Sequence, residues 1–298
     1  MLDYRGIEAL YTVNELQSFE AAAQKLHITQ SAVSQRIKGL ETFYGKPALT
    51  RSLPYQPTEL GRQLIAHFTR ISLLEGDLEE QMGKSAKTAR ITIALNRDSL
   101  ETWFLDLVKE TEIVRDISLE LIADDQELTL DYLRNGLVSA ALSTIEKEIQ
   151  GGRADYLGKM EYVLVASPKF VKRHFSGGKP KEYLRKAPAI KFDQNDRLHE
   201  RYLEKFFNLD GRELNYHVVP SVAGFRRFVL LGYGYALIPK LDILSELKKG
   251  SLVQLFEDKV WEIPLYWHYW AIESSSYLKF NKEVIQWATA KLNESTTC

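Results

Sequence analysis

The sequence has 298 residues, of which 45% are hydrophobic and 27% charged, and its formal net charge of −1 does not by itself indicate a polyanionic partner. Length and composition are those of a globular protein of roughly two domains, and no stretch approaches the about 18 consecutive apolar residues of a membrane-spanning helix. The only cysteine is Cys298, which excludes disulfide frameworks and cysteine-based metal sites.

The first predicted elements are two short helices within "AAAQKLHITQSAVSQRIKGLE" (residues 21–41). Ser18 and Thr29 are suitable N-caps because each precedes an apolar repeat at helical spacing. Ala22 and Ala23 carry little side-chain bulk and permit a close crossing of the two helices. On the second helix the apolar stripe is formed by Val33, Ile37, Leu40 and Tyr44.

The face of the second helix opposite this stripe is polar and partly cationic. Short hydrogen-bonding side chains in that position can contact base edges and phosphates in a DNA major groove. Basic residues dominate the segment 24–52, where Glu41 is the only acid. An ordinary helical hairpin with a solvated polar face is the alternative. The candidate DNA-binding residues of this helix and its cap are Thr29, Gln30, Ser31, Ser34, Gln35 and Lys38.

The following segment, "YGKPALTRSLPYQPTELG" (residues 44–61), contains three prolines and short apolar runs. This composition favours a small wing over a further helix. Arg51 on the wing is a candidate for contact with a phosphate or the minor groove. The sequence therefore predicts a winged helix-turn-helix.

A long helix is predicted to begin at Thr58 and Glu59. Its apolar positions are separated alternately by four and three residues, which is the seam of a coiled coil. Such a seam indicates a homodimer that would place two recognition helices about one DNA turn apart. The predicted seam positions are Leu60, Leu64, His67, Ile71, Leu74 and Leu78.

The rest of the chain alternates between strand and helix patterns twice, which predicts an α/β region of two lobes with parallel-rich sheets. In the first lobe the strands "RITIALN", "ISLELIA" and "LVSAALS" alternate with helices over residues 98–112 and 126–136. In the second lobe the strands "APAIKF", "LNYHVV" and "YALIP" alternate with helices over residues 196–207 and 222–231. Ligands of parallel sheets bind beyond the carboxyl ends of the strands.

Polar residues at these strand ends are the candidates for binding a small-molecule effector. Free N–H groups and hydroxyls at a helix start suit an α-carboxylate, and carboxylates suit an ammonium group, which is costly to leave unpaired in a cleft. The candidates in the first lobe are Asn96, Asp98, Ser99, Thr102, Trp103, Asp124, Asp125, Ser143 and Thr144. The candidates in the second lobe are Asp193 and Ser221.

Each of these residues also has a purely structural interpretation. Asp98 and Ser99 are placed to cap the helix that follows, and Trp103 has the size and spacing of a core residue. Asp124 and Asp125 can form a solvated turn, so we expect one of the two to touch a ligand. Several acids at the strand ends are compatible with lysine or arginine without choosing between them.

No catalytic motif is complete. "GKS" at residues 83–85 would need a glycine at Leu78 to form a phosphate-binding loop, and "HERYL" from His199 lacks the second histidine of a zinc-protease helix. "GYG" at residues 232–234 lacks the third glycine of a dinucleotide fingerprint, and no G-x-S-x-G elbow is present. We therefore expect neither enzymatic activity nor a cofactor or metal.

The motifs "SFEAAAQKLHITQSAVSQRIKGLE", "GKPALTRS" and "PTELGRQL" resemble the DNA-binding domain of LysR-type transcriptional regulators. "ALNRDSLETWFL", "LRNGLVSAALST", "LGKMEYVLVASPKF", "GYGYALIPK" and "LYWHYW" look most like the ArgP/LysG branch of that family, regulators of basic amino-acid export. Some members are also described as inhibitors of chromosome replication initiation. The departures, Arg97 in the N-x-D-S element and "TFYGKP" after the recognition helix, lie at the effector and wing edges.

The resemblance implies a division into a winged helix-turn-helix (residues 1–58), a linker helix for dimerisation (59–88) and an effector-binding domain (89–298). Within the last domain it implies a periplasmic-binding-protein-like fold. Its first lobe comprises residues 89–164 and 267–298, and its second lobe comprises residues 165–266. The chain would cross between lobes near Val165 and Tyr266.

We accordingly expect a LysR-type regulator that binds double-stranded promoter DNA and senses lysine or arginine, controlling an exporter or metabolic promoter. The resemblance further implies a homotetramer built from homodimers, with RNA polymerase as a further partner. Without a signal peptide or membrane span, and with almost no cysteine, the expected location is the cytoplasm. The alternatives are a LysR-type regulator that senses another small organic acid, and a solute-binding protein.

Overall fold

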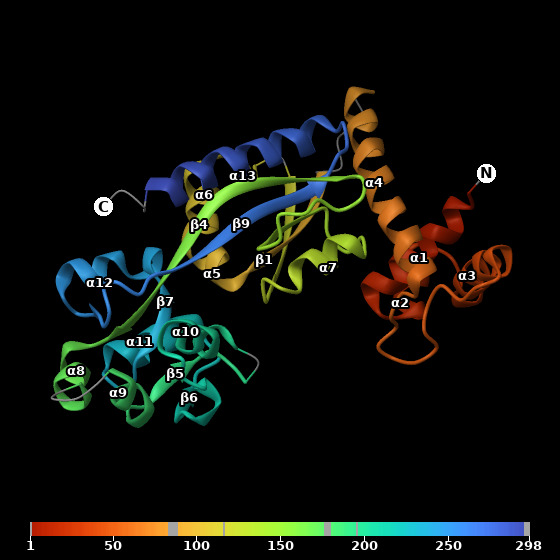
Figure 1. Cartoon of the computed structure of the whole chain (residues 1–298). Helices are drawn as coiled ribbons and strands as arrows, with labels where there is room; N and C mark the ends of the chain where they lie inside the picture. Colours follow the sequence, from red (N-terminus) through yellow and green to blue (C-terminus); the bar gives the residue numbers. More distant parts are fainter. Residues whose placement is uncertain (1, 83–88, 116, 176–179, 195, 295–298) are drawn as a thin grey trace. The chain divides into compact units, whose positions relative to one another are not determined.

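The structure is a computed structural model that describes residues 2–82, 89–115, 117–175, 180–194 and 196–294 (Figure 1). Its contacts divide the chain into two compact units. The first unit comprises residues 1–157 and 265–291, and the second comprises residues 158–264 and 292–298. The last residues of the predicted linker, 83–88, and Cys298 lie outside the described residues. The predicted domain boundaries stay predictions.

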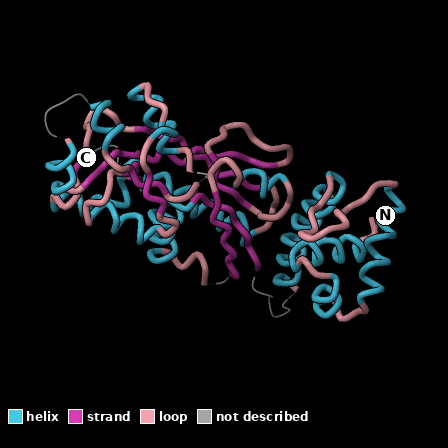
Figure 2. The backbone as a smooth tube through the Cα atoms, turned by 90° about the horizontal axis from the view of Figure 1, so that it is seen from below, coloured by secondary structure: helices cyan, strands magenta, loops and turns pink. Residues whose placement is uncertain are grey.

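The N-terminal region is built from three helices and a wing, and Figure 2 shows it almost wholly as helix and loop. The helices are α1 (Tyr4–Leu16), α2 (Phe19–Lys25) and α3 (Gln30–Tyr44). Both predicted N-caps are confirmed: the Ser18 hydroxyl accepts a hydrogen bond from the Ala21 N–H, and the Thr29 hydroxyl accepts one from the Ala32 N–H. These side chains satisfy N–H groups that a helix start leaves without partners.

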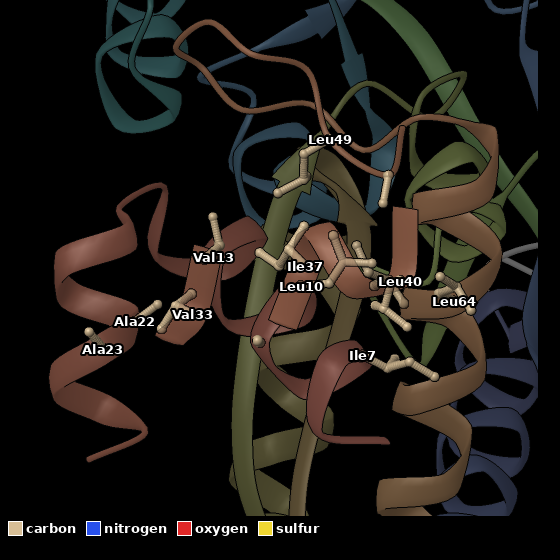
Figure 3. Close-up of a cluster of buried hydrophobic side chains, with 13 residues drawn as sticks. Ile7, Leu10, Val13, Ala22, Ala23, Val33, Ile37, Leu40, Leu49 and Leu64 are labelled. Atoms are coloured by element: carbon tan, nitrogen blue, oxygen red, sulfur yellow. The ribbon is translucent and has the colours of Figure 1, made fainter. Parts of the chain in front are cut away.

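The core of this region contains the apolar residues that the sequence placed on the inner helix faces (Figure 3). Full burial of one Leu, Ile or Val side chain stabilises a fold by about 1.5–3 kcal/mol, so the cluster holds the helix pair firmly. The labelled members are Ile7, Leu10, Val13, Ala22, Ala23, Val33, Ile37, Leu40, Leu49 and Leu64.

The wing is a short antiparallel turn back towards the next helix, with Leu49 bridging to Pro57. The Thr50 N–H donates to the Gln56 carbonyl at 2.9 Å, and the Thr58 N–H donates to the Ala48 carbonyl at 3.0 Å. The predicted wing is thereby confirmed.

The linker helix is α4 (Glu59–Gln81). Its predicted seam has two parts in the single chain. Leu64 is 6% exposed and packs with the helix-turn-helix core, whereas Leu74 and Leu78 are 41% and 55% exposed. The second part of the seam is therefore the apolar surface that this helix leaves uncovered.

The sheet of the first unit has parallel strands β1 (Ala89–Asn96), β2 (Ile117–Asp124) and β3 (Ala140–Ser143), with β1 in the centre. β9 (Trp261–Trp270) pairs antiparallel with β3. β4 (Gly152–Ala166) and β9 each run from one unit into the other. The predicted parallel sheet is confirmed for β1, β2 and β3, and an antiparallel strand, β9, lies beside β3.

Helices follow β1, β2 and β9 of this sheet. The predicted helix 98–112 is one helical run from α5 (Arg97–Ser99) through a π-helical turn (Leu100–Phe104) to α6 (Leu105–Glu110). The predicted helix 126–136 is shorter, as α7 (Thr129–Arg134), because residues 125–128 form the turn that leads into it. The C-terminal helix is α13 (Ser275–Glu294).

The second unit repeats the strand–helix alternation. β5 (Ala189–Lys191) pairs parallel with β6 (Tyr216–Val218), and β7 (Ala236–Pro239) pairs antiparallel with β4, as does β8 (Val253–Gln254). Its helices are α8 (Pro168–His174), α9 (Pro180–Lys186), α10 (Leu198–Phe207), α11 (Val222–Leu230) and α12 (Leu244–Lys249). α10 begins two residues later than predicted, because Asp196 accepts hydrogen bonds from the Phe192 and Leu198 N–H groups within the preceding loop.

Candidate functional site

The exposed face of α3 carries the candidate DNA-binding residues together. Gln30, Ser31, Ser34, Gln35 and Lys38 are all exposed, while Val33, Ile37 and Leu40 on the opposite face are buried. Since the first half of α3 presents short polar side chains and one ammonium group to solvent, it has the chemistry of a major-groove reader. Their contact with DNA stays a prediction.

Thr29 has a structural role at the start of this helix. Besides capping α3, its hydroxyl lies 3.0 Å from the Ser31 hydroxyl. Oriented hydroxyls and N–H groups at a helix start are common phosphate ligands. Thr29 therefore fits the phosphate side of an interface better than the base-reading side.

The wing, which carries the exposed Arg51, is held to the helices by defined anchors. The Glu41 carboxylate accepts a hydrogen bond from the Ala48 N–H at 2.8 Å. The Gln17 amide donates to the Tyr55 carbonyl at 3.0 Å, and the Phe19 ring meets the Tyr55 ring edge-on. The wing is thus packed onto the helix-turn-helix, and Arg51 lies in its exposed turn.

The candidate effector residues of the first unit gather at one edge of its sheet. Asn96, the last residue of β1, is paired in register with Asp124, the last residue of β2. β3 pairs with β1 at Ala94 and Ala141, so its end at Ser143 falls on the same edge. Parallel register therefore brings together side chains that are far apart in the sequence.

The helix that leaves β1 is capped by Asn96, whose side chain accepts a hydrogen bond from the Ser99 N–H at 3.3 Å. This corrects the structural interpretation that Asp98 or Ser99 caps it. The Ser99 hydroxyl is buried and has no hydrogen-bond partner in the described part of the chain. The Trp103 indole N–H is buried and unpartnered in the same sense. Two buried donors without acceptors are unusual in a folded protein, which makes this turn a candidate for ligand contact.

Thr102 and Asp98 lie in the same turn and are half-buried. The Thr102 hydroxyl donates to the Asp98 carbonyl at 2.6 Å, so that hydroxyl is already engaged by the backbone. The Trp103 ring is fully buried, as a core residue would be. Ligand contact by these three residues stays a prediction.

The two acids that follow β2 differ in their surroundings. The Asp124 carboxylate accepts hydrogen bonds from the Tyr132 hydroxyl at 2.6 Å and from the Asp125 N–H at 2.8 Å. The hydrogen bond to Asp124, followed by burial, raises the pKa of Tyr132. Asp125 is exposed and accepts from the Glu127 N–H in a turn. Of the pair, Asp124 is the better placed for a ligand.

Further polar groups complete this edge. The Ser143 hydroxyl accepts from the Ile145 N–H at 3.1 Å, and Thr144 is half-buried beside it. The sequence did not single out Gln126, whose side-chain oxygen lies 3.5 Å from the Asn96 amide nitrogen. Gln126 becomes a neighbour of Asn96 only through the pairing of β1 with β2, which brings these distant parts of the sequence together.

Asp193 and Ser221 belong to the second unit. Asp193 follows β5 and accepts from the Asp196 N–H at 2.9 Å. Ser221 follows β6, is exposed, and caps α11 by accepting from the Gly224 N–H at 3.2 Å. Since β5 and β6 are parallel, both residues lie beyond the same edge of that sheet.

The second unit also contains a buried polar cluster that the sequence did not indicate. Lys191 is 8% exposed, and its ammonium group lies 4.7 Å from the Tyr216 ring centre and 3.9 Å from the Glu200 carboxylate. His199 is 2% exposed, and burial, together with the Lys191 charge, lowers the pKa of His199 to about 3. His199 is therefore a neutral imidazole at physiological pH.

Two features are absent from the part of the chain that the structure describes. Those residues contain no group of three or more acidic, histidine or cysteine side chains that would hold a metal ion. No helix among them is long and apolar enough to cross a membrane.

Comparison with known families gives two matches along the chain. The family described as "Bacterial regulatory helix-turn-helix protein, lysR family" matches residues 4–62. The "LysR substrate binding domain" matches residues 85–277. The two matches cover the helix-turn-helix with its wing and most of the α/β region.

Individual proteins resemble the chain over nearly its whole length. The HTH-type transcriptional regulator ArgP of Vibrio vulnificus is 40% identical over 293 residues, which is 98% of this chain and 98% of that protein. The crystal structure of ArgP from Mycobacterium tuberculosis has a TM-score of 0.86 at 35% identity, covering 97% of this chain and 98% of that one. The full-length LysG of Corynebacterium glutamicum with bound effector Arg has a TM-score of 0.79 at 29% identity, covering 97% and 99%.

Proposed function

The chain belongs to the LysR family of bacterial transcriptional regulators, and from this premise we propose that it is a sensor of arginine or lysine. The observation that carries the proposal is the likeness to LysG, whose structure holds arginine as effector and resembles this chain over 97% of its length. The proposed gene target is an amino-acid exporter or a metabolic promoter.

The proposed effector site is the sheet edge formed by Asn96, Asp124 and Ser143, with the helix turn that follows β1. The unpartnered Ser99 hydroxyl suits the α-carboxylate of an amino acid. Asp98 and Asp124 supply carboxylates for a guanidinium or ammonium group, a charge-assisted contact stronger than a neutral hydrogen bond. Asp193 and Ser221, at the strand ends of the second unit, stay predicted effector residues of that unit.

The proposed DNA interface is the exposed face of α3 with Arg51 of the wing. Leu74 and Leu78 on α4 supply an apolar surface for a second copy of the chain, which supports a homodimer. We further propose that dimers assemble into tetramers, that the protein contacts RNA polymerase at the promoter, and that it acts in the cytoplasm.

The test of the proposed sensing is titration calorimetry with L-arginine, L-lysine and L-citrulline. Citrulline has nearly the shape of arginine, but its side chain ends in a neutral ureido group in place of the positively charged guanidinium group. We expect arginine or lysine to bind, and citrulline to bind at least about tenfold more weakly because a charge-assisted hydrogen bond contributes about 1.5–3 kcal/mol. Binding of citrulline as tight as that of arginine would contradict a site built on carboxylates.

A variant separates sensing from DNA binding. Asp98→Ala is expected to lose the response to the basic amino acid while its affinity for DNA stays within about twofold, because Asp98 lies outside the helix-turn-helix. Gel-shift titration with and without arginine measures both quantities. A wild-type response in this variant would remove Asp98 from the site.

A further inference from the structure

The linker helix α4 meets the sheet region of the first unit just after α7. The Thr69 hydroxyl donates to the Gly136 carbonyl at 2.9 Å, a contact between residues 67 positions apart in the sequence. The same hydroxyl lies 3.1 Å from the Ile65 carbonyl within α4. Thr69 therefore connects the linker helix to the chain segment that leaves α7.

The approach at this point is too close for any residue but glycine. Gly136 has a φ of +71°, and a Cβ added there would lie 2.3 Å from the Ala66 Cα and 2.4 Å from the Ala66 nitrogen. Both the backbone conformation and the space require a residue without a side chain. The backbone of Gly136 thus rests directly on the backbone of α4.

A second contact holds α4 to the same unit. The Arg70 guanidinium lies 4.8 Å from the centre of the Trp270 ring. Trp270 ends β9, and its backbone is fixed there because the Trp270 backbone N–H donates a hydrogen bond to the Tyr277 hydroxyl at 3.0 Å. The neighbouring residues Thr69 and Arg70 therefore both contact the sheet region, so α4 is held against it at two points.

The other contacts of α7 lead to the candidate effector edge. The Tyr132 hydroxyl donates to the Asp124 carboxylate at 2.6 Å. The Thr129 hydroxyl donates to the Leu142 carbonyl, one residue before Ser143. α7 is therefore hydrogen-bonded to the ends of β2 and β3, and the segment that leaves it is hydrogen-bonded to the linker helix.

We propose that α7 couples the effector site to the linker helix, with Tyr132 as the positioning residue at the effector end and the Thr69–Gly136 contact at the linker end. The proposal rests on the proposed function in one respect, namely that the effector binds at the Asp124 edge. A cationic group that binds the Asp124 oxygen that accepts the Tyr132 hydrogen bond draws charge from that oxygen and weakens the hydrogen bond. α7 then shifts its position, and the packing of α4 against the sheet region changes with it.

The energetic requirement for such coupling is a difference in effector affinity between the two arrangements of α7. Sharing of one carboxylate oxygen supplies that difference, because the Tyr132 hydrogen bond is stronger in the arrangement without effector than in the arrangement with effector. α4 moves with α7 because the backbone of Gly136 lies directly against the backbone of α4 and leaves no space between the two segments.

The first arm of the test uses no effector. Amide hydrogen exchange is measured on the full-length protein for Tyr132→Phe, which removes only the hydroxyl, with Tyr156→Phe as the matched control in the same unit. We expect exchange in α4 near Thr69 to rise about two- to tenfold in Tyr132→Phe, the effect of one lost hydrogen bond, and to stay unchanged in Tyr156→Phe. Unchanged exchange in α4 of Tyr132→Phe overturns the coupling, whatever arginine does.

The second arm adds L-arginine as the probe and compares Thr69→Val with Ser72→Ala. Ser72 donates to the Phe68 carbonyl within α4 in the same way that Thr69 donates to Ile65, so it controls for the intrahelical bond. Wild type and Ser72→Ala are expected to show an arginine-dependent change in α4 exchange. Thr69→Val is expected to bind arginine within about threefold of wild type by calorimetry and to lose that change.

The outcomes separate the two proposals. An arginine-dependent change in α4 that persists in both Thr69→Val and Tyr132→Phe overturns the coupling through α7. Absence of arginine and lysine binding to wild type overturns the proposed effector, while the first arm still decides whether α7 and α4 are coupled.

Discussion

At the scale of single residues, the side chains of α3 divide between a buried packing face and an exposed face that is the proposed DNA contact. Val33 and Ile37 are buried, whereas Gln35 and Lys38 on the other face are exposed. Substitutions on the exposed face are therefore expected to change contacts with DNA and to leave the fold intact. This separation makes recognition testable one residue at a time.

Gln35→Ala is expected to weaken binding to a duplex selected by the wild-type protein, while binding to a scrambled duplex changes by less than about twofold. A side chain that pairs with a base edge contributes about 1–3 kcal/mol of discrimination. Fluorescence anisotropy with both duplexes at one salt concentration measures the two affinities. Lys38→Gln is the control, because loss of a phosphate contact weakens both. Equal losses for Gln35→Ala would show that Gln35 reads no base.

At the scale of elements, α4 has two different surfaces along its length. Its first turns pack into the helix-turn-helix core through Leu64 and Ile65, and its later turns expose Leu74 and Leu78. The heptad spacing is continuous across both parts, so one helix links the DNA-binding region to the proposed dimer contact. A change in how α4 packs against the sheet region would therefore affect both the DNA-binding region and the proposed dimer contact.

Leu78→Lys is expected to convert dimers to monomers at micromolar concentration. A lysine in the apolar seam loses about 1.5–3 kcal/mol of leucine burial in each copy and places two like charges together. Sedimentation velocity measures the oligomeric state, and Glu75→Lys, on an exposed neighbour, is the control. A dimer of wild-type stability in Leu78→Lys would exclude this part of α4 as the contact.

At the scale of the whole molecule, the stability of the fold should depend on pH through His199. The folded pKa of about 3 lies below the unfolded value of about 6.5. Between these values the unfolded chain binds more protons than the folded one, so stability is lost as pH falls below about 6.5. Within this window, each pH unit of decrease lowers the free energy of unfolding by about 1.4 kcal/mol.

His199→Phe keeps a buried ring and removes the titration. Between pH 7 and pH 5 we expect wild type to lose about 2 kcal/mol through this group, and His199→Phe to lack that share. Urea unfolding at several pH values measures the difference, with His217→Phe, an exposed histidine of the same unit, as control. Equal pH dependence in wild type and His199→Phe would show that His199 is not held neutral by the fold.

The sequence by itself determined the local elements of this protein, because they depend on short-range patterns. Caps at Ser18 and Thr29, the apolar stripe of α3 and the alternation of strands and helices all follow from neighbouring residues. The motifs also sufficed for the family, which the comparisons confirm, and for the candidate edge positions Asn96, Asp124 and Ser143.

Only the tertiary structure decided which of these groups meet. The Asp124–Tyr132 hydrogen bond, the contact of Thr69 with Gly136 and the burial of Lys191 and His199 depend on register and packing between distant segments. No periodicity encodes such pairings, since they arise when separate elements compete for the same buried volume and unpaired polar groups must find partners. The sequence thus identified the parts of a regulator, and packing determined that the candidate effector edge and the linker helix both contact α7 or the segment that leaves it.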